Sequence, residues 1–261
     1  MPHRTHTRAA FSLIELSIVM VIIGLLVGGI LGGQSLIRSS ELRSVISDSQ
    51  KYSSAITQFR DQYNALPGDM LNATNYWGAE NVTPTTCRTA PSSSALTCNG
   101  NGDGLIRGST GSEEQFRFWQ QLSNAGIIQG NYTGARDGTI AYATTANNSP
   151  RGRISNSVWF VYNYGTVTST APFFDGTYLN TFEHGGMVTN DLPYAQIFRT
   201  SDLFYIDTKL DDGMPGRGTV VIRCQSGLSA CTNATSTTDL NATYRLSATG
   251  LVGNPVFHIK F

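Results

Sequence analysis

Residues 10–33 read AFSLIELSIVMVIIGLLVGGILGG, and this stretch decides the architecture of the chain. From position 16 to position 33 it holds eighteen consecutive residues without a charge, which is the length at which an apolar α-helix can span a bilayer. One carboxylate, Glu15, stands at the head of the run. A carboxylate at the edge of hydrocarbon is costly unless it is paired, so its presence here predicts a function for Glu15.

A short basic leader precedes the apolar run. The first ten residues, MPHRTHTRAA, carry Arg4 and Arg8 and no acidic residue, as in the n-region of an export signal. An ordinary secretory signal would place small residues for cleavage after its apolar core, but residues 34–38 read QSLIR. Cleavage between Ala10 and Phe11, before the core, would instead keep the apolar helix in the mature protein.

The stretch FSLIEL resembles the N-terminal cleavage and methylation motif of type IV pilins and type II secretion pseudopilins. Phe11 would be the first mature residue and Glu15 the fifth. The resemblance implies that a prepilin peptidase cuts between Ala10 and Phe11, and that the new amine of Phe11 is methylated. It also implies that Glu15 pairs with the Phe11 amine of a neighbouring subunit. Most such leaders end in glycine, and Ala10 departs from that pattern.

The same resemblance implies the partners and the location of the chain. The expected partners are the prepilin peptidase, other pilin or pseudopilin subunits, and an inner-membrane assembly platform. The chain would cross the bacterial inner membrane once, with its head in the periplasm, and then enter a pilus, a pseudopilus or the cell surface. The family resemblance covers about residues 8–67 and is weak beyond them.

Glycines recur within the apolar run at positions 24, 28, 29, 32 and 33. They form GxxxG spacings, which let membrane helices approach closely. Glycine is also common in spanning helices in general, so a packing role and a merely compositional origin both stay open.

The helix is predicted to continue past the membrane segment to about residue 65. Apolar side chains recur mostly in steps of three and four, as an amphipathic helix requires. They are Leu42, Val45, Ile46, Tyr52, Ile56, Phe59 and Tyr63. Pro67 and Gly68 then end the pattern, and the apolar positions do not keep the strict heptad of an anchored coiled coil.

These signals divide the chain into a leader at residues 1–10, a transmembrane and polymerisation helix at 11–37, an amphipathic half at 38–66 and a globular head at 67–261. The head is rich in strand signals, at residues 139–143, 158–164, 219–224, 244–247 and 256–261. Helices are expected just after Pro67-Gly68, from a Ser112 cap with Gln115 as its capping-box partner, and from a Ser201 cap to about residue 210. The predicted fold class is α+β, a long N-terminal helix packed on an antiparallel sheet.

The second helix, from Ser112, is expected to turn Phe116, Trp119 and Leu122 toward the core. Residues 182–186, FEHGG, are interpreted as a loop.

Four cysteines fall in two close pairs, Cys87 with Cys98 and Cys224 with Cys231. Neither pair has the spacing of a zinc or redox motif, so disulfides formed in an oxidising compartment are favoured over free thiols. Three pairings are possible, and the two sequence-local bridges are preferred because short loops close at a low cost in entropy.

Two polar motifs could hold calcium. The first, NGNGDGLI at residues 99–106, resembles the first half of an EF-hand-like loop, with Asn99, Asn101 and Asp103 alternating and the carbonyl of Leu105 as a fourth ligand. An Asn/Gly-rich turn that bonds only its own backbone explains the same residues, and this alternative stays open.

Calcium takes six to eight oxygen ligands, so the half-loop would need a further carboxylate. Glu113 or Glu114 could supply it if the chain folds back. The second motif is the run Asp207, Asp211 and Asp212, which is loosely similar to the late acidic calcium loop of major pseudopilins. A helix end followed by a turn is its ordinary interpretation.

Composition argues against several functions. Lys plus Arg and Asp plus Glu both number 18, and loss of the leader leaves sixteen basic against eighteen acidic residues. Nucleic acid is therefore an unexpected partner. No HExxH pair or other catalytic pattern is present, so an enzyme is not predicted. The large head favours a minor or specialised filament subunit, and the alternative is a membrane-anchored binding or adhesive domain, or less readily an enzyme, outside a filament.

Overall fold

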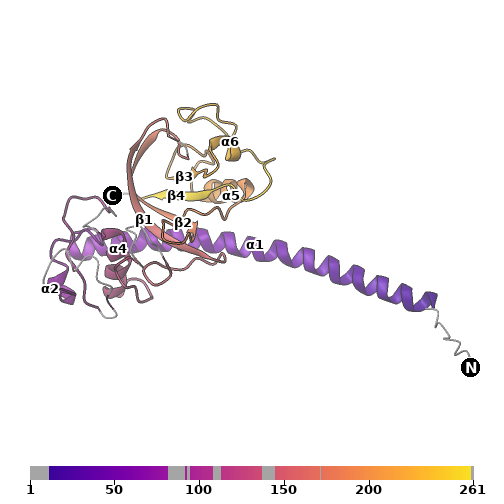
Figure 1. Cartoon of the computed structure of the whole chain (residues 1–261), viewed down its shortest axis with the longest axis horizontal. Coiled ribbons are helices and arrows are strands. Elements are labelled where there is room, and N and C mark those ends of the chain that lie inside the picture. The colour runs from indigo at the N-terminus through magenta and orange to yellow at the C-terminus, as the bar shows by residue number, and fades with distance from the viewer. Residues whose placement is uncertain are drawn as a thin grey trace, which may run out of the picture. The chain divides into compact units, whose positions relative to one another are not determined.

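The computed structural model describes residues 12–81, 92, 95–107, 113–136, 145–170 and 172–259 (Figure 1). Contacts divide the chain into two units, Met1–Arg43 and Ser44–Phe261. The first unit holds the apolar part of the N-terminal helix. The second holds the rest of that helix and the whole head.

Helix α1 extends over Leu13–Tyr63 and contains 51 residues, so the prediction of one unbroken helix is confirmed to within two residues at its end. None of the residues that the structure describes buries its 18-residue apolar window, and by length and composition α1 could cross a membrane. The helix ends at Asn64, which has a left-handed φ of 50° and donates its N–H to the carbonyl of Arg60. Pro67 then prevents continuation.

The amphipathic half of α1 buries one face in the head. Val45, Ile56 and Phe59 are at most 2% exposed. The ring of Tyr52 contacts two tryptophans edge-on, Trp119 at 5.0 Å and Trp159 at 5.3 Å between ring centroids. These contacts pack α1 against the helix that holds Trp119 and against the strand that holds Trp159. The apolar periodicity of residues 45–63 is therefore that of a helix with one buried face.

The sheet has four antiparallel strands in the order β1-β2-β4-β3. They are β1 (Ser157–Val167), β2 (Gly176–Gly186), β3 (Val220–Arg223) and β4 (Asn254–His258). The long β1 and β2 form the curved ribbon of Figure 1. In register, Trp159 faces His184 and Phe182 faces Phe257, so large rings stack through the middle of the sheet.

Helices complete the head. They are α2 (Thr74–Trp77), α4 (Glu114–Asn124), α5 (Thr200–Leu210) and α6 (Leu228–Cys231). Phe116, Trp119 and Leu122 of α4 are at most 1% exposed, as predicted. Together with α1 and the antiparallel sheet, they give the predicted α+β class.

Both predicted helix caps were wrong. Helix α4 is capped by Glu113 in a left-handed conformation, not by Ser112, which lies outside the described residues. Helix α5 begins at Thr200 with Arg199 as its cap, and the Arg199 N–H donates to Asp202 Oδ2 at 3.0 Å. Ser201 therefore lies inside the first turn. In α5 a carboxylate at the third helical position accepts the N–H of the cap residue, and this arrangement does not need a serine at the cap.

The strand predictions succeeded unevenly. Residues 158–164 and 219–224 correspond to β1 and β3, and 256–261 overlaps β4. The expected strand at 244–247 was wrong, because Leu246 and Ala248 donate to carbonyls two and three residues back in tight turns. Tyr244 makes an isolated bridge to Thr232. The expected strand at 139–143 lies outside the described residues.

Strand β2 was missed, and the loop expected at residues 182–186 was wrong. Strand β2, which includes residues 182–186, pairs with β1 along its length and with β4 near its middle. Its polar side chains are buried but bonded: Glu183 accepts a hydrogen bond from the Tyr164 hydroxyl at 2.9 Å and lies 3.7 Å from Arg223 Nη1. Such partners satisfy polar groups in a core strand.

A disulfide joins Cys224 to Cys231, with their Cα atoms 6.0 Å apart. It ties the end of β3 to α6. Cys98 is also disulfide-bonded, and Cys87 lies outside the described residues, so the predicted Cys87–Cys98 bridge stays a prediction.

Candidate functional site

Side chains at the N-terminal end of α1 cap the helix in an arrangement close to a capping box. The Ser12 N–H donates to Glu15 Oε2 at 2.8 Å, and the Ile14 N–H donates to Ser12 Oγ at 3.3 Å. This reciprocal arrangement satisfies N–H groups that have no partner at a helix start. It also places a negative charge where the helix dipole favours one. Ala10 and Phe11 lie outside the described residues.

The capping role of Glu15 was visible in the sequence and was overlooked. SLIE at residues 12–15 has the S-x-x-E spacing of a capping box directly before an apolar run. Glu15 therefore has a partner on its own helix in the isolated chain.

Three carboxylates from distant parts of the sequence meet in the head. One oxygen each of Asp69, Asp103 and Glu114 lies within 4.8 Å of the others. Asp69 follows the turn after α1, and Glu114 opens α4. Sequence reasoning found Asp103 and named Glu114 as a possible partner, but it missed Asp69, because an aspartate after a Pro-Gly turn carries no ligand signal of its own.

The loop at residues 99–107 is built around these buried acids. Asp69 accepts N–H hydrogen bonds from Gly102 at 2.7 Å and from Gly104 at 2.8 Å. Glu114 accepts two more at 3.2 Å, from the N–H groups of Asn101 and Arg107. The loop takes its shape from carboxylates that lie elsewhere in the chain.

The remaining predicted ligands of this loop have other partners. Asn101 Oδ1 accepts the Asp103 N–H at 2.9 Å, and the Leu105 N–H donates to Asp103 Oδ1 at 2.8 Å. Asn99 Oδ1 accepts the Thr74 N–H at 2.8 Å and so bonds to α2. Glu113 forms an ion pair with Arg136 at 3.4 Å, which leaves Glu114 as the glutamate of the cluster.

Burial controls the protonation of this cluster. It raises the pKa of Glu114 to about 7, and the nearby charges of Asp69 and Asp103 add to the rise, while the N–H donors of Arg107 and Asn101 oppose it. Burial also raises the pKa of Asp69, against the N–H groups of Gly104 and Gly102. Repulsion among three carboxylates is relieved by a proton or by a cation.

The second acidic run, Asp207, Asp211 and Asp212, also converges within 4.8 Å. Asp207 accepts the hydroxyl of Tyr244 at 2.7 Å and the N–H of Gly213 at 3.1 Å. Burial raises the pKa of Asp207 to about 7, opposed mainly by the Tyr244 hydrogen bond.

The other two carboxylates of this run bind nearby groups. Asp211 Oδ2 accepts the N–H groups of Thr219 and Val220, which fixes the start of β3. Asp212 forms an ion pair with Arg217 at 3.1 Å. Because Arg217 already neutralises one of the three charges, this run fits calcium less well than the Asp69 cluster does.

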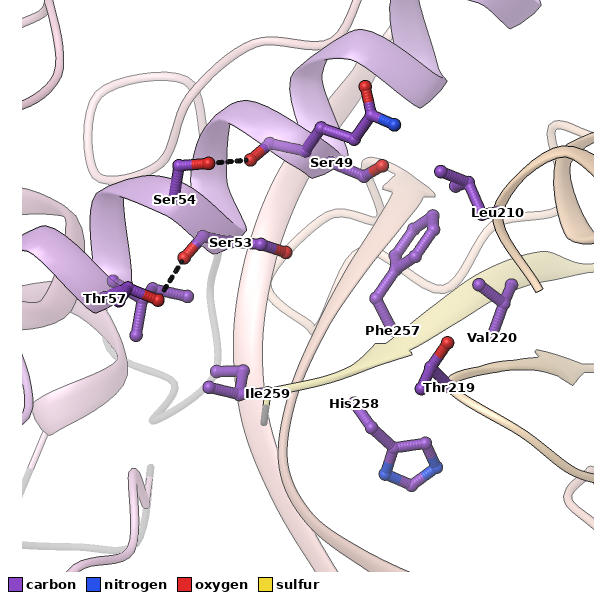
Figure 2. A pocket seen from close by; sticks show the side chains of 12 residues that line it. Ser49, Ser53, Ser54, Thr57, Leu210, Thr219, Val220, Phe257, His258 and Ile259 are labelled. Carbon is purple, nitrogen blue, oxygen red and sulfur yellow. Dashed lines mark hydrogen bonds between the residues drawn. The ribbon is translucent and has the colours of Figure 1, made fainter. Parts of the chain in front are cut away.

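A neutral groove lies between α1 and the end of β4 (Figure 2). Its volume is about 370 Å³, and its lining residues include no Asp, Glu, Lys or Arg. Ser54 and Thr57 on α1 donate their hydroxyls to the carbonyls of Gln50 and Ser53. The apolar side chain of Phe257 comes from β4, and that of Ile259 from the residue just after the end of β4. Apart from His258, the groove lacks groups for acid–base chemistry.

The buried histidine of FEHGG packs against the core. His184 Nε2 lies 2.9 Å from Ser157 Oγ, and the hydroxyl of Ser157 donates to the Ile154 carbonyl. The imidazole stacks on Trp159 at 4.6 Å, and both His184 and Ser157 are at most 3% exposed. The pair therefore has a packing role.

The family model described as the prokaryotic N-terminal methylation motif matches residues 5–31. The chain carries the hallmark of type IV pilins and pseudopilins. The match includes the predicted cut and Glu15, and the antiparallel α+β head fits a pilin-like fold. No curated protein and no solved structure matches the chain significantly.

The buried acids of the head predict the response of the chain to pH. Glu114 and Asp207 have raised pKa values in the folded state, so their contribution to stability is complete below their unfolded pKa values, near 4. It is lost as the pH rises through about 7. Between about pH 5 and pH 8 we expect the free energy of unfolding to fall by about 3–5 kcal/mol, since each of the two groups contributes about 1.4 kcal/mol per pH unit up to its raised pKa.

Chemical denaturation of the full chain in detergent and EDTA measures this slope. Glu114→Gln should reduce it by about half, because Asp207 still titrates, while Asp61→Asn, at an exposed carboxylate, should leave it unchanged. Equal slopes in the wild type and Glu114→Gln would contradict the assignment.

Calcium binding stays a prediction, and the Asp69 cluster is its better site. Calorimetry on the full chain at pH 8 should show calcium binding, and calcium should raise the melting temperature, because a ligand that binds the folded state stabilises it. Asp103→Asn should weaken binding by about tenfold or more, since it removes one of three carboxylates. Asp212→Asn is the matched control in the other run. If calcium produces neither binding heat nor a higher melting temperature, the chain does not bind calcium.

Proposed function

We propose that this chain is a pilin-like structural subunit. A prepilin peptidase cleaves it between Ala10 and Phe11, Phe11 is N-methylated, and α1 assembles the subunit into a type IV pilus or a type II secretion pseudopilus. The motif match over residues 5–31 carries the proposal. The uncovered apolar window of α1 supports it, because such a surface needs either lipid or other helices around it.

Glu15 is the residue that assembly would use. In the single chain its carboxylate accepts the Ser12 N–H. In a filament, the methylated amine of Phe11 on a neighbouring subunit would supply a full positive charge. The bond from the Ser12 N–H has a charge on the acceptor alone, whereas the ammonium would add the opposite charge on the donor and so form an ion pair. A surrounding of apolar helices would strengthen that pair further.

The glycines of α1 suit a helix that exchanges lipid for protein neighbours. A Cβ added at Gly24, Gly28 or Gly32 would meet nothing within 4 Å, so no contact among the described residues requires glycine there. Close approach of another helix is a reason for small residues at this spacing. The three positions therefore support an intermolecular role.

The location follows from the same proposal. The subunit spans the inner membrane once, holds its head in the periplasm and then joins a filament. The head is large, since residues 67–261 lie beyond the helix. We propose a minor or specialised subunit for that reason.

Mass spectrometry of the mature protein tests the processing step. We expect loss of residues 1–10 and a monomethylated Phe11 amine in cells that contain a prepilin peptidase. Ala10→Gly, which restores the usual leader ending, should be cleaved at least as completely. An intact Met1 in the membrane-bound protein would favour the alternative, a membrane-anchored binding or adhesive domain outside any filament.

Substitutions at Glu15 separate its two roles. Glu15→Gln can still accept the Ser12 N–H through its amide oxygen but has no charge, whereas Glu15→Ala loses both functions. We expect both variants to insert in the membrane and both to enter sheared filaments at about a tenth of the wild-type level or less, because a lost buried ion pair costs more than tenfold.

Glu41→Gln is the matched control for this experiment, since it removes another carboxylate from the same helix. The Glu41 carboxylate forms an ion pair with Arg38 at 3.0 Å. This variant should assemble normally. Normal assembly of Glu15→Gln would show that capping, rather than charge, is the function of Glu15.

A further inference from the structure

A second cavity opens at the C-terminal end of α1. Its volume is about 780 Å³, within the range of small-molecule sites. Arg60, Asp61, Tyr63 and Asn64 line it from the end of the helix, and Leu71 and Asn72 from the turn that follows. The backbone of Gly102 and Gly104 also contributes.

Three polar side chains of this cavity are free to bind a ligand. Asp61, Asn64 and Asn72 are exposed, and within the described residues their side chains make no hydrogen bond or ion pair. Asp69 differs, because both its oxygens already accept N–H groups of the loop. The cavity thus offers one carboxylate and two amides, each of which can form two hydrogen bonds side by side.

An aromatic wall accompanies these polar groups. The ring of Tyr63 lies 4.6 Å from Phe59, 5.1 Å from Tyr76 and 5.4 Å from Trp77 between centroids. Four rings in contact hold Tyr63 in place, so a ligand would meet a rigid apolar surface. Leu71, 63% exposed, extends that surface.

We propose that this cavity binds a neutral saccharide. Adjacent sugar hydroxyls both donate and accept hydrogen bonds, so they match the two carboxylate oxygens of Asp61 and the amide oxygen and nitrogen of Asn64 and Asn72. The C–H face of a sugar ring packs on an aromatic side chain, here that of Tyr63. An apolar ligand would leave these polar groups without partners.

Charge argues against the other classes of ligand. An anion would be repelled by Asp61 and Asp69, with Arg60 as the one cation among the lining residues. A cation would match Asp61 but not the amide donors of Asn64 and Asn72. The saccharide site is independent of filament assembly, so each can fail without the other.

The test uses the full chain in a zwitterionic amine-oxide detergent, because maltoside headgroups are themselves saccharides. Calorimetry and saturation-transfer NMR are run with maltotetraose, cellotetraose, chitotetraose, mannotetraose and galactotetraose. At least one should bind with a Kd of about 1 mM or tighter. Saturation transfer should be strongest on the protons of one sugar face, the face that contacts Tyr63.

Variants connect the binding to the cavity. Asp61→Ala and Asn72→Ala should each weaken it by about tenfold or more, since each removes paired hydrogen bonds. Asn64 is left intact because its left-handed φ of 50° would strain an alanine. Asn75→Ala is the matched control, an exposed asparagine of α2 outside the lining, and should bind as the wild type does.

Failure is equally defined. Absence of binding by all five oligosaccharides at about 10 mM overturns the proposal. Binding that neither Asp61→Ala nor Asn72→Ala weakens overturns it as well, and so does equal weakening by Asn75→Ala. Thermal unfolding of each variant confirms that a loss of binding is not a loss of fold.

Discussion

The uncovered apolar surface of α1 is the constraint on which the rest of the chain depends. Its 18-residue apolar window is uncovered within the described part of the chain, and in water such a surface would drive aggregation. A helix can enter lipid because its backbone groups are satisfied internally, and it can leave lipid only for other helices. The uncharged residues of this segment suit lipid, and its glycines allow other helices to approach closely.

Buried carboxylates organise the head in a comparable way. Asp69 and Glu114, which are buried, and Asp211, which is half-buried, each accept two backbone N–H groups. Removing these acids from water is costly, as the raised pKa values of Asp69 and Glu114 show. The cost is offset because each acid accepts two backbone N–H groups, and hydrogen bonds to a charged group are stronger than those between neutral groups. The glycine-rich loop at residues 99–107 therefore has a defined shape with little apolar burial of its own.

The sequence predicted those parts whose signals are local. The periodicity of residues 45–63 and the stop at Pro67 predicted α1, and β-branched and aromatic residues predicted β1. Strand β2 was missed because Glu183 and His184 are polar residues typical of a loop. Their partners in the fold, Arg223 and Trp159, are distant in the sequence. Asp69 was missed for the same reason, since Gly102 and Gly104 give it its role. Polar residues in a core are interpretable only with their partners.

Glu15 lies at the start of the uncovered apolar segment of α1, and like the buried carboxylates of the head it accepts a backbone N–H. Its bond to the Ser12 N–H and its place in the first helical turn stabilise the charge on its own helix, so the single subunit does not hold an unpaired carboxylate at the membrane edge. In the proposed filament, the Phe11 amine of a neighbour would replace or share that N–H. The carboxylate would then exchange one partner for a stronger one without passing through an unpaired state. Such an exchange would lower the barrier for a helix to leave lipid, and in the proposed filament it would account for an acid at the head of the apolar run rather than within it.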